Sequence, residues 1–336
     1  MKNKGLIRVS LAFIIVTALA SWTRTHQPQP EEATSSLPLP IRGFNQNWSF
    51  LPDITTDLKQ NLLALKPDMI RYPGGTVTHK WDWREGWVPG RNNSVKHPLS
   101  HLAELSSYTN TKVMFDLDIV NSTVEDQIEM LQTAEGLGIE IKYLELGNEL
   151  FLKSNFPDIF PTGTEYATRV AAWVLALKAA YPNAKIAACL NGKTPGGADT
   201  RGLQWNNKVL TQLSALGVEL DAYTFHIYIQ PTQTFQNRIT DFENVKGAIQ
   251  SQITGKEIWI TEYGNQKQPT EPEYYTELEA LADYVEGFAD ISLNHTIIAA
   301  NPPGDKLNAD GSGFVPEGIM YKNRRILQDS TSIPCN

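Results

Sequence analysis

The chain has 336 residues, of which 41% are hydrophobic and 20% charged, a composition typical of a globular protein and unlike that of a disordered one. A chain of this length can bury a large core without disulfide or metal staples. It carries 29 Lys and Arg against 37 Asp and Glu, a formal net charge of -8, which argues against broad electrostatic attraction to nucleic acid. Its six His and two Cys show no zinc-binding spacing.

The first forty residues predict an exported protein. Positive charges among the first eight residues precede an apolar run over 11–20, which matches a secretory signal peptide cleaved near Ala20. The run is half of the roughly 20 residues that a transmembrane anchor needs, so no such anchor is expected. Residues 21–40 are polar and contain four Pro, as in a flexible linker. We therefore expect a signal peptide over 1–20, a linker over 21–40 and one folded domain over 41–330, in a secreted or periplasmic protein.

The two cysteines give no firm disulfide. Cys189 lies in an apolar, strand-like run, and Cys335 is the penultimate residue. Export would permit a bond between them, but we favour a buried thiol at Cys189 and an unpaired one near the C-terminus, and leave the pairing open.

From residue 41 onward, short β-like runs alternate with longer amphipathic stretches. Helical patterns cover 53–65, 123–137, 165–180 and 274–288, with a short final helix near 321–328. The expected strands cover 41–47, 69–75, 112–120, 143–149, 185–191, 222–228, 257–264 and 295–300. This alternation predicts an α/β fold with parallel strands, a single (β/α)8 TIM barrel. A doubly wound sheet is the alternative, but the segment after the first strand, Gly43-Phe-Asn-Gln-Asn-Trp, is not the Gly-rich turn it would need.

Each expected strand ends near a polar residue. In a barrel these ends form one ring at the face where such enzymes carry out their chemistry. The ring consists of Asn45, Arg71, Asp118, Glu149, Asn191, His226, Glu262 and Asn301.

Two glutamates of this ring are candidate catalytic residues. Strand alternation puts Glu149 at the rim of the fourth strand, on the face of Glu145, and Glu262 at the rim of the seventh, on the face of Ile258 and Ile260. Two carboxyl groups facing each other across a barrel mouth suit the splitting of a glycosidic bond, where one is a protonated acid and the other an ionised nucleophile. The alternative is that each is an ordinary rim residue in an ion pair.

Three further side chains favour the catalytic interpretation. His226 and Tyr228 share a strand face beside Glu262, so Tyr228 can hold the carboxylate and His226 can bind a sugar hydroxyl. Arg71 lies just below the mouth, where it can pair with Glu262 and keep it ionised. A structural ion pair with Glu145 one layer down is the alternative for Arg71, and the two roles are compatible.

The segment 76–95 is expected to be a long exposed loop that carries Trp81 and Trp83. Indole faces stack on sugar rings, so we expect these two side chains to form a binding platform. The net negative charge argues mildly against a strongly anionic glycan, although a local patch of Lys80, Arg84 and Arg91 could override it.

Several motifs resemble the clan of retaining (β/α)8 glycoside hydrolases: Gly147-Asn148-Glu149, His226-Ile-Tyr228 and Trp259-Ile-Thr-Glu262-Tyr-Gly264. Arg71-Tyr-Pro-Gly-Gly75 with Trp81-Asp-Trp83 looks most like the α-L-arabinofuranosidase family, and Leu144-Glu-Leu-Gly-Asn-Glu149 is as close to the heparanase and β-glucuronidase family. The resemblance implies that Glu149 is the acid/base, that Glu262 is the nucleophile and that Asn148 binds the sugar 2-hydroxyl. One departure is the expected eighth strand, which ends Ile298-Ala-Ala-Asn301 without the Trp that many members place there.

The sequence therefore predicts an exported retaining glycoside hydrolase that cleaves a poly- or oligosaccharide by double displacement. Two carboxylates and fixed dipoles handle the charge, so no metal or cofactor is implied. A catalytically silent sugar-binding protein on the same barrel and a transglycosylase remain as alternatives. The sugar, the linkage, endo or exo action and the oligomeric state stay open. The expected substrate-binding residues are Asn45, Arg71, Trp81, Trp83, Asn148, His226 and Tyr228.

Overall fold

The computed structural model describes residues 40–91, 95–299 and 305–331. The predicted signal peptide and all but the last residue of the predicted linker lie outside these residues, as do Asn301 and Cys335. Among the helices that the structure describes, none combines the length and the apolar character that crossing a membrane requires.

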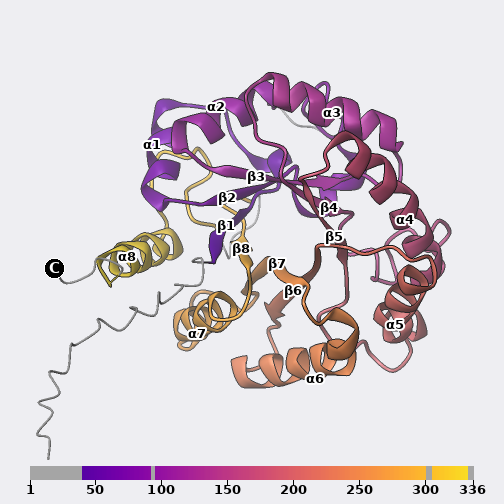
Figure 1. Cartoon of the computed structure of the whole chain (residues 1–336). Helices are drawn as coiled ribbons and strands as arrows, with labels where there is room; N and C mark the ends of the chain where they lie inside the picture. The colour runs from indigo at the N-terminus through magenta and orange to yellow at the C-terminus, as the bar shows by residue number, and fades with distance from the viewer. Residues whose placement is uncertain (1–39, 92–94, 300–304, 332–336) are drawn as a thin grey trace, which may run out of the picture. The chain divides into compact units, whose positions relative to one another are not determined.

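Eight parallel strands form a closed barrel in which each strand pairs with its neighbours in chain order and β8 pairs with β1. Figure 1 shows the strands in the middle and the helices around them. The structure thus confirms the (β/α)8 TIM barrel. The strands are β1 Ile41–Asn45, β2 Met69–Tyr72, β3 Lys112–Leu117, β4 Tyr143–Leu146, β5 Lys185–Cys189, β6 Ala222–Ile229, β7 Glu257–Asn265 and β8 Ile291–His295.

Several connecting helices begin after a side chain that accepts from one of their free N–H groups. Thr162, for example, forms a capping box with Glu165 at the start of α4, an arrangement worth about 1 kcal/mol. The helices are α1 Thr56–Leu65, α2 Leu99–Thr109, α3 Val124–Gly136, α4 Gly163–Ala180, α5 Thr200–Ala215, α6 Phe235–Ile253, α7 Tyr274–Glu286 and α8 Pro316–Thr331, with short 3-10 helices η1 Trp48–Phe50 and η2 Gly75–Lys80.

The core has two parts because successive strand residues face opposite sides. A large apolar cluster lies between the strands and the helices, and a smaller one fills part of the barrel interior. The interior cluster consists of Met69, Met114, Tyr143, Ala187, Ala222, Trp259, Ile291 and Leu293. The next inward residues on β2, β3 and β4 are charged: Arg71, Asp116 and Glu145 are all buried. This change from apolar to charged marks where the site begins.

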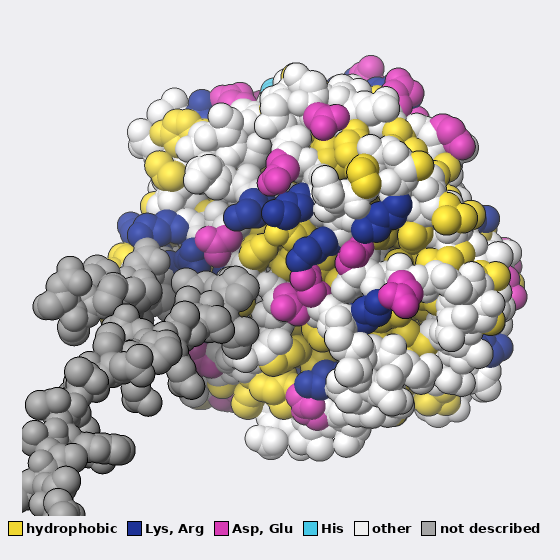
Figure 2. Space-filling model, in the orientation of Figure 1, with side chains coloured by type: hydrophobic (Ala, Val, Ile, Leu, Met, Phe, Trp, Pro, Cys, Tyr) yellow, Lys and Arg dark blue, Asp and Glu magenta, His cyan; other side chains and the backbone are white. Residues whose placement is uncertain are grey.

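Charge on the surface is mixed in sign. Figure 2 shows one face of the molecule, on which Lys and Arg side chains lie next to Asp and Glu. Exposed and half-buried ion pairs elsewhere in the fold include Lys256 with Glu219 and Lys178 with Asp221. Such exposed pairs are worth about 0–1 kcal/mol each, so the apolar core carries the stability of the barrel.

The prediction for the eighth strand is wrong. β8 spans Ile291–His295, not 295–300, and pairs in parallel with β1 through Ile41–Ile291 and Asn45–His295. Its outward face carries Ser292 and Asn294, which are polar yet buried, so the strand does not look apolar in the sequence. The apolar residues that follow belong to a loop held by Gln46, whose Oε1 accepts from the backbone N–H groups of residues 297 and 298.

The fourth strand is shorter than predicted. β4 ends at Leu146, and Gly147 and Glu149 both have positive φ, 85° and 47°. A non-glycine residue held in the left-handed region costs about 1–3 kcal/mol, and such strained residues cluster at active sites. Glu149 therefore leaves the barrel wall on a bent segment and not as a continuation of the strand.

Candidate active site

Arg71 is the centre of a buried polar network inside the barrel. Its Nε donates to Glu145 Oε2 over 2.6 Å, and its Nη1 donates to Glu262 Oε1 over 2.8 Å and to Asn45 Oδ1 over 3.1 Å. Its Nη2 lies 3.0 Å from Asn148 Oδ1 and 2.8 Å from Asp116 Oδ2. All five guanidinium hydrogens thus face acceptors. The two sequence-based alternatives for Arg71 hold together, because it pairs with Glu262 and with Glu145.

The inward position of Glu262 comes from a β-bulge. On β7 the predicted face was wrong: Trp259 belongs to the interior cluster, whereas Ile258 and Ile260 pack against the helices. The pairing of β7 with β6 then shifts by one residue, so that Phe225 faces Ile260 but His226 faces Glu262. The extra residue is Thr261, and both it and Glu262 end up buried at the mouth. Bulges of this kind commonly re-aim side chains next to active sites.

The surroundings of Glu262 favour its ionised form. Burial alone would raise the pKa of its carboxyl group, but the charges of His226, Arg71 and His295 and a hydrogen bond from Tyr228 outweigh it and lower the pKa to about 2. The hydroxyl of Tyr228 donates to Glu262 Oε2 over 2.7 Å. This contact was predicted from the strand alternation of β6.

His295, at the end of β8, was missed by the sequence analysis because the strand was misplaced. Its Nδ1 lies 2.8 Å from the hydroxyl of Tyr228. The hydroxyl of Tyr228 has a single hydrogen, which it donates to Glu262, so it accepts a hydrogen bond from His295. The three side chains therefore form a hydrogen-bonded chain from His295 through Tyr228 to Glu262. Burial lowers the pKa of His295.

Glu149 and Glu262 meet at His226. Nδ1 of His226 lies 2.9 Å from Glu149 Oε1 and 3.6 Å from Glu262 Oε2. The three side chains each place one potential ligand atom within 4.8 Å of the others, so they are also a possible metal-binding group within the described residues, although here they form a hydrogen-bonded set. Burial lowers the pKa of His226, but Glu262 and Glu149 raise it more, and the net shift is upward.

The directions of the hydrogen bonds around His226 indicate which ring nitrogens carry a hydrogen. Thr261 Oγ1 donates to Glu145 Oε1, so it accepts from Nε2 of His226, 3.2 Å away. Nε2 therefore carries a hydrogen, and Nδ1 shares a single further proton with Glu149 Oε1. The proton resides either on the carboxyl group or on the imidazole.

Asn148 is anchored by a second histidine that the sequence analysis did not single out. The backbone N–H of Asn148 donates to His79 Nε2 over 3.1 Å, which places the ring hydrogen on Nδ1, facing Asp118 Oδ1 at 3.1 Å. Asp118 also accepts from the backbone N–H groups of Val120 and Asn121. Asp118 therefore supports the loop that carries Glu149.

Asp116 lies fully buried beneath the mouth. Its Oδ2 accepts from the hydroxyl of Thr78 over 2.5 Å and faces Arg71. Burial raises the pKa of this carboxyl group, Arg71 lowers it, and Glu145 and Glu262 raise it again, to about 8 in total. Burial is the largest cause, and the one guanidinium charge, shared by three carboxyl groups, does not offset it.

The expectation of an exposed tryptophan platform is wrong for Trp81 and Trp83, which are only 8% and 7% exposed. Nε1 of Trp81 donates to the hydroxyl of Tyr72, and Nε1 of Trp83 donates to Asp126. The segment after β2 folds back through η2 and a bridge between Asp82 and Trp87, which packs both indoles against the outside of the barrel. Of the predicted site residues, these two stand apart from the network.

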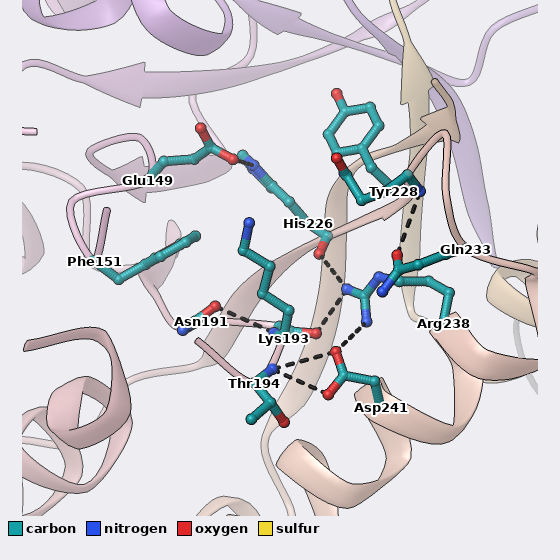
Figure 3. Close-up of a pocket in the computed structure, with 12 residues that line it drawn as sticks. Glu149, Phe151, Asn191, Lys193, Thr194, His226, Tyr228, Gln233, Arg238 and Asp241 are labelled. Atoms are coloured by element: carbon teal, nitrogen blue, oxygen red, sulfur yellow. Dashed lines mark hydrogen bonds and ion pairs between the residues drawn. The ribbon is translucent and has the colours of Figure 1, made fainter. Parts of the chain in front are cut away.

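A pocket opens beside Glu149 and is lined by residues of the loops after β4, β5 and β6. Figure 3 shows Glu149, His226 and Tyr228 at one side of it and Asn191, Lys193 and Arg238 at the other. On the opposite side the backbone comes close to Glu262: a Cβ added at Gly75, where φ is 64°, would lie 3.2 Å from Glu262 Oε1. A side chain at this position would therefore crowd the carboxylate of Glu262.

The model of the glycosyl hydrolase catalytic core matches residues 113–293, which run from β3 to β8 and contain both glutamates. The chain belongs to the glycosyl hydrolase catalytic core family. No curated protein sequence matches this glycosyl hydrolase.

Solved structures of glycosidases share the fold of this glycosyl hydrolase. An arabinofuranosidase superposes with a TM-score of 0.62 at 14% identity, over 84% of this chain and 69% of that one. An α-L-arabinofuranosidase from Thermotoga maritima gives 0.54 at 14% identity over 81% of this chain, which spans 64% of that enzyme's length. A fungal β-1,4-galactanase gives 0.57 at 14% identity, over 85% and 99% of the two chains. The resemblance to (β/α)8 glycoside hydrolases is confirmed, in family by the matched model and in fold by the solved structures.

Proposed function

We propose that this glycosyl hydrolase cleaves its substrate with retention of configuration, with Glu262 as nucleophile and Glu149 as acid/base. The supporting observation is their separation: one oxygen of each lies within 4.8 Å of the other. Retaining enzymes hold the two carboxyl groups about 5–5.5 Å apart, whereas inverting enzymes leave about 6.5–9.5 Å for a water molecule.

The first step uses Glu262 in its ionised form. Its carboxylate attacks the anomeric carbon, the bond to the leaving oxygen breaks, and that oxygen takes the proton held between Glu149 and His226. Arg71 and Tyr228 each bind one carboxylate oxygen of Glu262, which orients it for attack. In the second step Glu149 removes a proton from water, the water oxygen attacks the anomeric carbon, and Glu262 is released.

Asn148 and Asn45 are proposed to bind the sugar whose bond is cleaved. The carbonyl oxygens of both side chains accept from Arg71, so their amide hydrogens remain as donors toward sugar hydroxyls. The proposal assigns Asn148 to the 2-hydroxyl, where a hydrogen bond strengthens in the transition state. His226 borders the same space.

Export is part of the proposal and depends on the sequence of residues 1–20.

The test is hydrolysis of aryl glycosides by the protein and by its Glu149→Gln and Glu262→Gln variants. The panel contains α-L-arabinofuranoside, β-glucuronide, β-xyloside, β-glucoside and β-galactoside. We expect one substrate to be cleaved and each variant to lose about 10²-fold or more, since a positioned acid or base contributes about 10²–10⁴-fold. Glu140→Gln, an exposed position before β4, is the matched control and should keep full activity.

Stereochemistry decides the mechanism. The sugar first released should have the anomeric configuration of the substrate in a proton NMR time course. Release of the opposite anomer would refute the retaining mechanism. Binding of oligosaccharides with no turnover would favour the silent sugar-binding protein, and glycosyl transfer to an added sugar in preference to water would favour the transglycosylase.

A further inference from the structure

The pocket beside Glu149 extends into a longer groove. A second pocket shares Phe151, Asn191 and Lys193 with it and continues over Lys153 and Pro195. If Glu149 protonates the leaving oxygen, as proposed above, the leaving sugar lies in this groove, because Glu149 lines it. The inference below rests on that assignment.

Lys193 directs a positive charge into this groove. Figure 3 shows its side chain running toward Glu149 and His226, with the amino group at the open space between them. Among the described residues no ion pair or hydrogen bond engages its Nζ. Two nearby acidic side chains are oriented by the backbone: Asp199 accepts from the N–H of Gly202, and Asp241 accepts from that of Thr194.

The loop that carries Lys193 is held on both sides by one ion pair of α6. Arg238, which is 2% exposed, donates through Nη2 to the carbonyl oxygens of Gly192 and His226. Its partner Asp241, 3.3 Å from Nη1, accepts from the backbone N–H of Thr194. The residues before and after Lys193 are therefore both fixed relative to His226, so the amino group is presented by an ordered backbone.

We propose that Lys193 binds an anionic substituent, a carboxylate or a sulfate ester, on the sugar that leaves. An unpaired ammonium next to the scissile bond forms a charge-assisted hydrogen bond with such a group and has no comparable partner on a neutral sugar. In the predicted basic patch, Arg84 is paired with Asp126 and Glu129, and Arg91 donates to the hydroxyl of Ser49. The attraction is local, since the whole chain carries a net charge of -8.

The test compares leaving groups that differ only in charge. Using the glycoside found in the panel, kcat/KM is measured for neutral carbamoylphenyl, carboxyphenyl and sulfophenyl leaving groups, the last two separating carboxylate from sulfate-like recognition. We expect the protein to prefer an anionic leaving group about tenfold, Lys193→Met to bring the ratio close to one, and Lys193→Arg to restore part of it. Lys208→Met, which removes the same charge from α5 outside the groove, should keep the wild-type ratio.

A binding measurement separates this inference from the proposed function. The affinity of the Glu262→Gln variant for tetragalacturonate and for galactotetraose is measured with and without Lys193→Met. Turnover without any charge preference would overturn the inference and leave the function intact. Charge preference in binding that depends on Lys193, without turnover of any glycoside, would support the inference and overturn the function. Neither turnover nor charge-dependent binding would overturn both.

Discussion

At the scale of single residues, Arg71 shows how a buried charge is accommodated. A guanidinium without partners in the barrel interior would cost several kcal/mol, but here each of its hydrogens faces an oxygen. This arrangement changes the pKa values of the carboxyl groups around Arg71. Three carboxyl groups around one cation do not all ionise with equal ease, so the protein keeps the pKa of Glu262 low and that of Asp116 high.

Asp116 should make the protein less stable as pH rises. The pKa of its carboxyl group is raised from 3.8 to about 8 by folding. The folded state therefore holds a proton that the unfolded chain releases between about pH 4 and pH 8, and the free energy of unfolding should fall across this window. Asp116→Asn should make that fall smaller. Urea unfolding at pH 5, 6.5 and 8 measures it.

The matched control for this experiment is Asp158→Asn, which removes an exposed carboxyl group from the loop before α4. It should leave the pH dependence of the wild type unchanged. An equal flattening by both substitutions, or none by Asp116→Asn, would contradict the assignment. Glu262 acts in the opposite direction, because its lowered pKa adds stability that is lost as pH falls from about 4.5 toward 2.

At the scale of elements, the ends of two strands carry the site through irregular backbone. The bulge at Thr261 in β7 brings Glu262 inward, and the positive φ of Gly147 and Glu149 bends the chain after β4. Neither the bulge nor the bend can be predicted from the alternation of inward and outward residues along a strand. The segment after β2 supplies the support for the bend, because η2 places His79 next to the backbone of Asn148.

His79→Ala should lower kcat more than it changes KM. The substitution removes the acceptor of the Asn148 N–H and the partner of Asp118, so the segment that carries Glu149 loses its support. A misplacement of about 1 Å can cost on the order of 10²-fold in rate. His79→Gln, which retains an acceptor, should recover part of the loss. Steady-state kinetics together with thermal unfolding are the measurement, and an unchanged kcat in a destabilised His79→Ala protein would contradict the positioning role.

At the scale of the whole molecule, stability depends on closure of the barrel between its first and last strands. Five residue pairs join β1 to β8, and α8 adds an ion pair from Arg325 to Asp68, which follows α1. Lys306, fully buried behind β8, binds Glu317 of α8 over 2.6 Å and the carbonyl of His295 over 3.0 Å. The C-terminal helix therefore helps to hold the end of β8 that carries His295.

Removal of residues 1–39 should leave the fold and the activity unchanged, because the barrel begins with β1 at Ile41. The expected change in Tm is below about 2 °C, which corresponds to roughly 1 kcal/mol of stability in a domain of this size. Calorimetry of the two chains measures it. A third chain that also lacks β1 opens the barrel and should not fold, and a large loss of Tm in the first deletion would refute the predicted domain boundary.

Much of the fold and part of the site could be predicted from the sequence, because both depend on the pattern of apolar residues along the chain. Alternating strand and helix patterns dictate a parallel barrel because buried faces must be covered, and period-two alternation on β6 correctly placed His226 and Tyr228 toward the mouth. Arg71 and Glu262 were paired correctly because unlike charges at one rim attract.

Only the tertiary structure decided the rest. It showed that a bulge turns Glu262 inward and that β8 ends at His295, before the apolar segment predicted as the eighth strand. It also showed that Trp81 and Trp83 are buried. It also revealed His79 and His295, whose roles depend on neighbours more than 60 residues away in the chain. Local sequence patterns report which faces are apolar, whereas a bulge, a bent rim and a hydrogen-bond partner depend on contacts between distant segments.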